Sequence, residues 1–216
     1  MNLPFTAEEF FEVFAKYNNA VYPIQIIFAL AAFFILLVIF KRFTKLYSLT
    51  WLILALFWAW VGVVYHIKFF SPINPVAKVF GVLFIVESIL LTYYGAIKKK
   101  IEFDYKPGVN IYIGIFLLTY SLLIYPLITI ATGHSYPSLP TFGVPCPTTI
   151  YTIGLFFLTN LSATPKKLFI IPILWSLIAT TAAVKLYVYA DIVLIVSSLL
   201  LIISLLTGKN RKTVLQ

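Results

Sequence analysis

GHSYPSLPTFGVPCPTT, residues 133–149, lies between two apolar stretches of membrane length, and the rest of the chain is organised around it. It holds four prolines, the only cysteine (Cys146) and one of the two histidines (His134), and it contains no charged side chain. A segment that merely joined two helices would be short and polar, whereas a rigid, aromatic and apolar one suits packing back into the protein. We therefore predict that the functional site lies here.

The composition of the whole chain is that of an integral membrane protein. Of 216 residues, 62% are hydrophobic and 11% are charged, and the mean hydropathy is +1.00. A water-soluble core of this size does not bury so much apolar surface. The net charge of +9 comes from short basic clusters beside apolar runs, which favours the lipid bilayer as partner and argues against nucleic acid. The first 20 residues lack a basic n-region and a long apolar h-region, so no cleavable signal peptide is expected.

Residues 5–19 are predicted to form a short amphipathic interfacial helix. Thr6 and Glu9 have the spacing of a capping box, and Phe5 and Phe10 are placed as its hydrophobic staple. Aromatic residues recur on one face and glutamates on the other. Because this helix is too short and too charged to span, we expect it on the membrane surface or against the bundle.

Seven apolar runs follow, and most have the roughly 20 residues needed to cross a hydrocarbon core of about 30 Å. The fifth is shorter and is expected either to begin below the membrane surface or to continue a few residues into Thr164. Because the connections are short, the predicted fold class is an all-α membrane protein, a single domain of seven antiparallel transmembrane helices. The predicted spans are residues 21–40, 46–66, 76–97, 110–132, 147–161, 168–187 and 191–207.

The basic residues set the expected orientation, with the N-terminus outside and the C-terminus cytoplasmic. This orientation places 12 of the 16 lysines and arginines inside, as the positive-inside rule requires. A six-span alternative, with residues 147–161 re-entrant, would move Lys166 and Lys167 outside and reverse the tail. The remaining inner residues are Lys41, Arg42, Lys45, Lys98, Lys99, Lys100, Lys106, Lys209, Arg211 and Lys212, and the outer ones are Lys16, Lys68, Lys78 and Lys185.

This topology gathers three ligand-type side chains at the outer face, together with Asp191 as a candidate fourth metal ligand. His66 ends the second span, and His134 and Cys146 lie in residues 133–149. Imidazole and thiolate groups suit a transition metal or haem, and Cys146 could instead be the nucleophile of a thiol-dependent acyl transfer. No closely spaced motif prearranges the three residues. The simpler alternatives are an interfacial histidine and a small buried thiol.

Glu87 lies near the middle of the third predicted span, where an ionised carboxylate is costly without partners or water. We predict a functional carboxylate, either protonated at rest or paired with Tyr120 and Ser121, which lie at a similar depth in the fourth span. The alternative is a neutral carboxyl group hydrogen-bonded between helices.

Further polar residues at the outer face have two interpretations each. Asp191, at the start of the last span, is expected mainly to cap that helix, with ligand binding as the alternative. Asn74 is predicted to cap the third span in the same way. Tyr65, beside His66, is a candidate ligand contact. Lys185 could contact a ligand or extend to the lipid headgroups.

Three runs of sequence carry a resemblance to a known family: FTAEEFFEVFAKYN (5–18), YHIKFFSPINP (65–75) and HSYPSLPTFGVPCPTT (134–149). Together they resemble an uncharacterised family of bacterial multi-pass membrane proteins, known only as a domain of unknown function. The resemblance covers nearly the whole chain and implies a multi-pass protein of the bacterial inner membrane. It implies no activity and no role for any individual residue.

We expect the protein to bind a small solute or a metal ion in an extracytoplasmic recess, for transport or sensing. His66, His134 and Cys146 would form the outer site, and Glu87 a deeper station sensitive to protons or cations. One alternative is a membrane-embedded enzyme that uses a metal, haem or the thiol at the outer face. Another is a structural or assembly partner, in a homo-oligomer or beside another membrane protein.

Overall fold

The computed structural model describes residues 4–213, except for the side chains of residue 182 and of residues 208–213. Within residues 4–213 the fold is all-α, with no β-strand beyond two isolated bridges. The structure does not describe three of the basic side chains that are predicted to be cytoplasmic, namely those of Lys209, Arg211 and Lys212.

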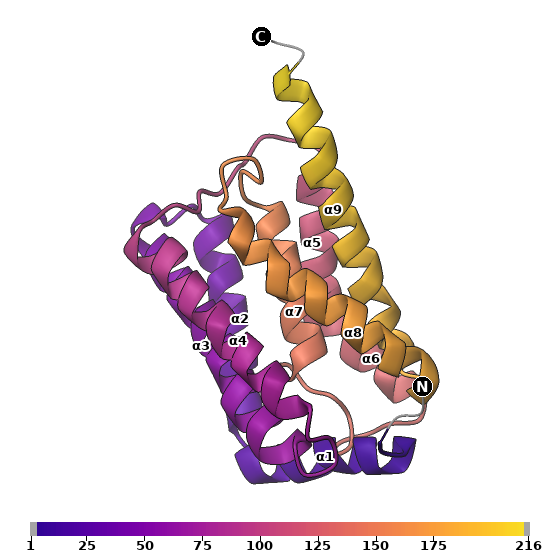
Figure 1. Ribbon diagram of the computed structural model, residues 1–216. Helices are drawn as coiled ribbons and strands as arrows, with labels where there is room; N and C mark the ends of the chain where they lie inside the picture. The colour runs from indigo at the N-terminus through magenta and orange to yellow at the C-terminus, as the bar shows by residue number, and fades with distance from the viewer. Residues whose placement is uncertain (1–3, 214–216) are drawn as a thin grey trace.

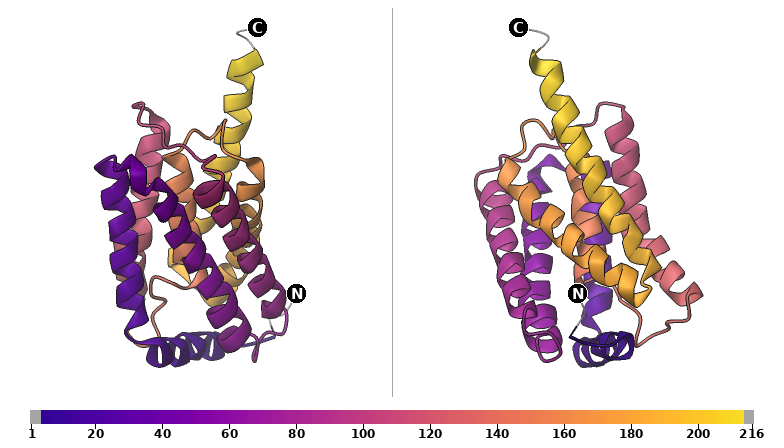
Figure 2. Two further views of the ribbon diagram at one scale, coloured as in Figure 1. Left: turned by 90° about the vertical axis from the view of Figure 1, so that its left-hand side faces the viewer. Right: turned by 45° about the vertical axis from the view of Figure 1, so that its right-hand side comes forward.

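From α2 onward, successive long helical segments run in opposite directions along one bundle, and α5 and α6 belong to one such segment because η4 joins them (Figures 1 and 2). The α-helices are α1 (Ala7–Val21), α2 (Ile24–Phe40), α3 (Tyr47–Trp60), α4 (Ala77–Leu91), α5 (Val109–Thr119), α6 (Tyr125–Ala131), α7 (Pro145–Phe157), α8 (Ile170–Leu186) and α9 (Ile192–Thr213). π-Helical segments are η2 (Val61–Phe70), η3 (Thr92–Ile97) and η4 (Tyr120–Ile124). Short 3-10 segments are η1 (Thr44–Leu46), η5 (Lys166–Phe169) and η6 (Tyr189–Asp191).

Five of the described helical segments are long and apolar enough to cross a membrane. The number rises to six if α1 and α2, which meet at a bend of 86°, are counted as one broken span. Large hydrophobic side chains such as Leu30, Ile89 and Leu127 are exposed on the outside of the bundle, as a lipid-facing surface requires. The five segments are Thr44–Phe70, Ala77–Ile97, Val109–Ala131, Lys166–Leu186 and Tyr189–Thr207.

Two of the predicted spans are shorter than expected. The first, residues 21–40, is helix α2 of 17 residues, because the chain turns between α1 and Ile24. The fifth, residues 147–161, is helix α7, which has 13 residues and ends at Phe157. The structure therefore supports five or six membrane-length segments rather than all seven.

Helix α7 is the central helix of the bundle. Residues 147–157 are all buried, and α7 packs against α3, α5, α8 and α9 (Figure 1). A helix that is apolar all round and enclosed by other helices has no lipid-facing side. Its shortness is therefore compatible with a position inside the bundle.

Helix α1 lies across one end of the bundle, which we call the α1 end (Figure 1). The predicted capping box is confirmed, because Glu9 N–H donates to Thr6 Oγ1 at 3.2 Å and Thr6 N–H donates to Glu9 Oε2 at 2.8 Å. The predicted staple is confirmed as well, since the rings of Phe5 and Phe10 stack with centroids 5.9 Å apart. These local signals fix where α1 begins.

The substitution Thr6→Ala is expected to fray the first turn of α1, because the Glu9 N–H loses its acceptor. Loss of such a cap costs about 1 kcal/mol of helix stability. Hydrogen exchange measured on the first turn of α1 should rise severalfold, while exchange in α7 stays unchanged. The control Thr6→Ser keeps the acceptor, and equally fast exchange in both variants would contradict the prediction.

Segment η2 packs unusually closely against α4. A Cβ atom added to Gly62 would lie 2.7 Å from the Gly81 carbonyl oxygen, and one added to Gly81 would lie 2.8 Å from the Gly62 carbonyl oxygen. Only glycine allows two backbones to approach in this way. The contact presses the His66 ring against Phe84 of α4, with centroids 4.7 Å apart.

Candidate functional site

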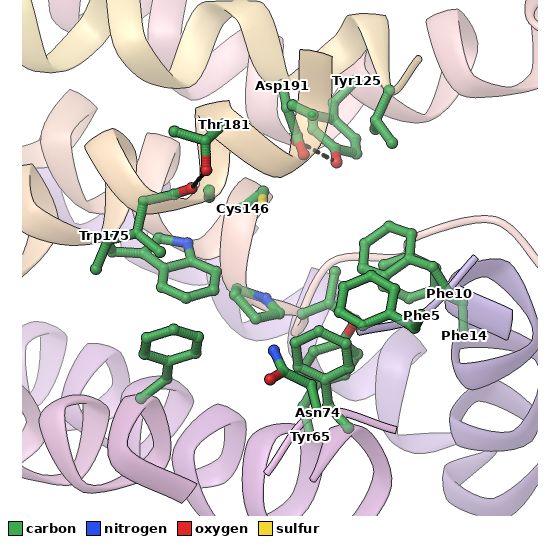
Figure 3. Close-up of a pocket in the computed structure, with 18 residues that line it drawn as sticks. Phe5, Phe10, Phe14, Tyr65, Asn74, Tyr125, Cys146, Trp175, Thr181 and Asp191 are labelled. Carbon is green, nitrogen blue, oxygen red and sulfur yellow. Dashed lines mark hydrogen bonds between the residues drawn. The ribbon is translucent and has the colours of Figure 1, made fainter. Parts of the chain in front are cut away.

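A cavity of about 140 Å³ lies at the α1 end of the bundle, which we call the α1-end cavity (Figure 3). Residues from α1, η2, α6, α7, α8 and η6 line it. Most of its wall is apolar, and the polar side chains include Asn74, Cys146 and Asp191. Aromatic rings that face it include Phe5, Phe10, Phe14, Tyr65, Phe70 and Trp175.

Asp191 is held at this cavity by two tyrosines. The hydroxyl of Tyr125, in α6, donates to Asp191 Oδ1 at 2.7 Å, as Figure 3 shows. The hydroxyl of Tyr120, in η4, donates to the carbonyl oxygen of Ala190 at 2.9 Å. One tyrosine therefore fixes the carboxylate, and the other fixes the backbone beside it.

The prediction that Asp191 caps the last span is wrong in this structure. The helical path begins earlier, with the 3-10 turn η6, whose N-cap is Val188. Asp191 is therefore inside the helical run rather than ahead of it, and its side chain accepts a bond from Tyr125. The predicted cap by Asn74 is also wrong, because the N-cap of α4 is Val76 and no side chain caps it. Asn74 lines the α1-end cavity instead.

Cys146 lies in the first turn of α7 and lines the same cavity as Asp191. Pro145 precedes it at the start of the helix, where a missing N–H is harmless. Trp175 of α8 lies near Cys146 in the cavity wall (Figure 3). Its indole nitrogen has no hydrogen-bond partner among the described residues. The segment of residues 133–149 therefore reaches the cavity through its C-terminal part.

The two histidines are not in this cavity. His66 is fully buried behind its wall, in contact with Trp175 at a centroid distance of 4.9 Å, and neither ring nitrogen has a described partner. His134 stacks on Phe11 at a centroid distance of 3.6 Å. Among the side chains that the structure describes, no three of the types His, Cys, Asp and Glu are grouped to hold a metal ion.

The predicted set of His66, His134 and Cys146 is thus not brought together as a metal or haem site. The physical reason is that residues 133–144 fold against α1, so that His134 packs on Phe11. His66, in η2, instead packs on Phe84 of α4 and Trp175 of α8. The predicted topology puts these three side chains on the same side of the membrane, but they are not in contact with one another.

Glu87 and Lys185 also lie away from the cavity. Glu87 is fully buried in α4, and neither carboxyl oxygen has a hydrogen-bond partner among the described residues. The predicted pairing is wrong, because Tyr120 donates to Ala190 and Ser121 donates to the Leu118 carbonyl oxygen. Lys185 is exposed on α8 and does not line the cavity.

Sequence reasoning missed Asn18, the residue that holds residues 133–144 against α1. The amide of Asn18 donates to the carbonyl oxygens of Pro137 at 2.6 Å and Leu139 at 2.8 Å. Thr141 donates to Asn18 Oδ1 at 2.9 Å. Asn18 is completely buried on an otherwise hydrophobic face of α1. A polar residue within such a face needs hydrogen-bond partners, and this was the signal available in the sequence.

Tyr125 and Trp175 were missed for a different reason. Both lie in long apolar spans, where aromatic residues are usual packing elements. A buried tyrosine hydroxyl or indole N–H needs a polar partner, so each residue predicts a polar group nearby. The sequence does not identify that group, which for Tyr125 is Asp191, 66 residues away.

Comparison with known proteins places this chain in a family. No curated protein and no solved structure matches it. Residues 7–215 match the family of unknown function DUF6064, which agrees with the resemblance carried by the three runs of sequence. Because the match covers nearly the whole chain, this protein belongs to the DUF6064 family.

Proposed function

We propose that this protein is a seven-span integral protein of the bacterial inner membrane that binds a small solute in an extracytoplasmic recess, for transport or sensing. The observation that carries the proposal is the α1-end cavity, where Asp191 stands among aromatic walls. Pockets of this kind, mostly apolar with a few placed polar groups, are typical of small-molecule sites. In this proposal Glu87 is an ionisable group deeper in the membrane, which binds a proton or a cation.

The distribution of charge supports an extracytoplasmic α1 end. The basic clusters lie in the connections after α2, α4 and α7, at the end opposite α1 (Figure 1). The positive-inside rule assigns such an end to the cytoplasm. This orientation also puts the α1-end cavity on the outer side, where it is open to solutes from outside the cell.

The alternation of the long helical segments supports the proposed seven-span topology. Helix α2 and the enclosed helix α7 run along the bundle with the five longer segments (Figure 2). If either were re-entrant, the basic connections would fall on both sides of the membrane, against the charge rule. Because protein surrounds α7, it does not need the full thickness of the hydrocarbon core.

An organic solute suits the cavity better than a metal ion or a thiol reaction. Asp191 and Cys146 supply one carboxylate and one thiol, without an imidazole in the lining as described, whereas transition-metal sites usually need three or four such ligands. The reactive form of a cysteine is the thiolate, and the neighbouring Asp191 carboxylate opposes a second negative charge. Binding of an organic solute needs neither additional metal ligands nor a thiolate, so the side chains that line the cavity are sufficient for it.

The test is to fill the cavity. Ala179 lines it from α8, and Ala179→Phe is expected to occupy much of the volume of about 140 Å³. Small molecules that co-purify with the protein in mild detergent are identified by mass spectrometry. We expect at least one solute bound to the wild type to be lost in Ala179→Phe, because the two cannot share the space.

The matched control is Ala131→Phe, which adds the same ring at an exposed position of α6. It should retain the solute. Monodisperse elution of both variants shows that they are folded. A solute retained equally by folded Ala179→Phe would contradict the proposed site.

A further inference from the structure

The α1-end cavity combines three features that restrict the chemistry of its ligand. Aromatic rings dominate its wall, Asp191 is its acidic group, and in the described lining there is no lysine, arginine or histidine. The chain as a whole carries a net charge of +9. The lining of this cavity, with one carboxylate and no basic side chain, therefore has a charge opposite in sign to that of the whole protein. Such a recess favours a cation over an anion.

We propose that the ligand is a small organic ammonium ion whose charged nitrogen binds at Asp191 and whose apolar body packs on the aromatic wall. This proposal rests on the proposed function and names the class of solute. In this proposal Asp191 determines the specificity for a positively charged ligand. Trp175 and Tyr65 contact the apolar body of the ligand.

The surroundings of Asp191 leave a role for a cation. Its Oδ1 atom accepts from Tyr125, a neutral donor, and in the described part of the chain no ion pair includes Asp191. It is 4% exposed, and a buried carboxylate without an opposite charge is costly. An ammonium ion at this position offsets that cost by supplying the opposite charge.

The aromatic wall suits the same ion. Trp175 lines the cavity opposite the phenylalanines of α1 (Figure 3), and indole and phenyl faces attract ammonium groups by the cation–π interaction. Tyr65 closes another side from η2. Because these rings also bury apolar surface, they bind the body of the ligand while Asp191 binds its charge.

The size of the cavity bounds the ligand. Its volume of about 140 Å³ is close to the roughly 150 Å³ of an apolar protein cavity that holds benzene. A single ring with a short aminomethyl arm is therefore the right scale for a probe. Larger amines would require the floor formed by α1 to move.

The experiment compares three probes of one size and different charge, namely benzylamine, benzyl alcohol and benzoate. Binding to purified protein in mild detergent at neutral pH is measured by isothermal titration calorimetry. We expect benzylamine to bind at least about tenfold more tightly than benzyl alcohol, and benzoate not to bind, because Asp191 attracts only the cation. Asp191→Asn keeps the shape and removes the charge, so it should abolish the preference for the amine.

The control variant is Asp104→Asn, which removes a carboxylate in the connection between η3 and α5, away from the cavity. It should retain the full preference for benzylamine. A second variant, Trp175→Leu, should weaken benzylamine and benzyl alcohol alike, because it removes ring surface and not charge.

The results separate the two proposals. Equal affinity for benzylamine and benzyl alcohol, unchanged by Asp191→Asn, would overturn the ammonium ion and leave the cavity as a solute site. No heat of binding with benzylamine, for a folded wild type, would also overturn it. The proposed function fails separately, if filling the cavity with Ala179→Phe leaves the co-purifying solutes unchanged.

Discussion

Asn18→Leu is expected to detach residues 133–144 from α1 and to destabilise the protein by about 3 kcal/mol. The wild-type side chain donates to the carbonyl oxygens of Pro137 and Leu139 and accepts from Thr141. Leucine has a similar volume and can make none of these bonds.

The large effect comes from the groups that remain behind. An intramolecular hydrogen bond contributes about 1 kcal/mol net, but a buried acceptor left without a donor costs its full desolvation, about 1 to 3 kcal/mol. Leu139 is buried, so water cannot readily replace the Asn18 amide at its carbonyl oxygen. The free energy of unfolding, measured by denaturant titration in mild detergent, should fall accordingly.

Asn19→Leu is the matched control, since Asn19 is the next residue of α1 and is exposed. It should leave stability within about 0.5 kcal/mol of wild type. Limited proteolysis within residues 133–144 should accelerate in Asn18→Leu alone. If both variants unfold at the wild-type denaturant concentration, the Asn18 contacts do not hold this segment.

Glu87→Leu is expected to make the protein more stable by about 1 to 3 kcal/mol while abolishing its function. Both carboxyl oxygens of Glu87 are buried without a described partner, and removing an unpartnered buried polar group relieves its desolvation cost. An ionisable residue inside a membrane-length helix is costly, and this cost supports the proposed functional role of Glu87. Thermal unfolding in mild detergent measures the gain in stability.

Glu87→Gln tests the role of the ionisable group with almost no change of shape. If the protein transports its solute in exchange or symport with protons, uptake into proteoliposomes driven by a proton gradient should be lost in this variant. Binding at the α1-end cavity should persist, because Glu87 does not line it. Glu102→Gln, which changes an exposed carboxyl group, should leave uptake intact.

Two outcomes would contradict this account of Glu87. A loss of several kcal/mol in Glu87→Leu would mean that the carboxyl group makes a stabilising interaction in the folded protein. Gradient-driven uptake at the wild-type rate in Glu87→Gln would exclude Glu87 from coupling.

The local features of this protein could be predicted from its sequence. The capping box of Thr6 and Glu9 and the staple of Phe5 and Phe10 are both present, because each depends on residues within one or two helical turns. The membrane-length segments were also predicted, within a few residues at most ends, because the length and apolarity of a run are properties of neighbouring residues. The two short helices, α2 and α7, show the limit of that reasoning.

The candidate site was predicted only in part. Residues 133–149 and Asp191 do meet at one cavity with Tyr65, as the outer-face topology suggested. The topology could not tell that His134 would stack on Phe11 or that Glu87 would have no partner. Those outcomes depend on the rotation of each helix about its axis, which hydropathy does not specify.

The sequence by itself determined an all-α fold with several membrane-length apolar helices, their approximate boundaries and the distribution of charge. Hydrophobicity, capping and charge act over short distances along the chain. Only the tertiary structure decided which polar groups meet. Tyr125 reaches Asp191 across 66 residues, and Asn18 reaches Leu139 across 121. Contacts at such separations arise from the packing of whole helices, and that packing assembled the α1-end cavity.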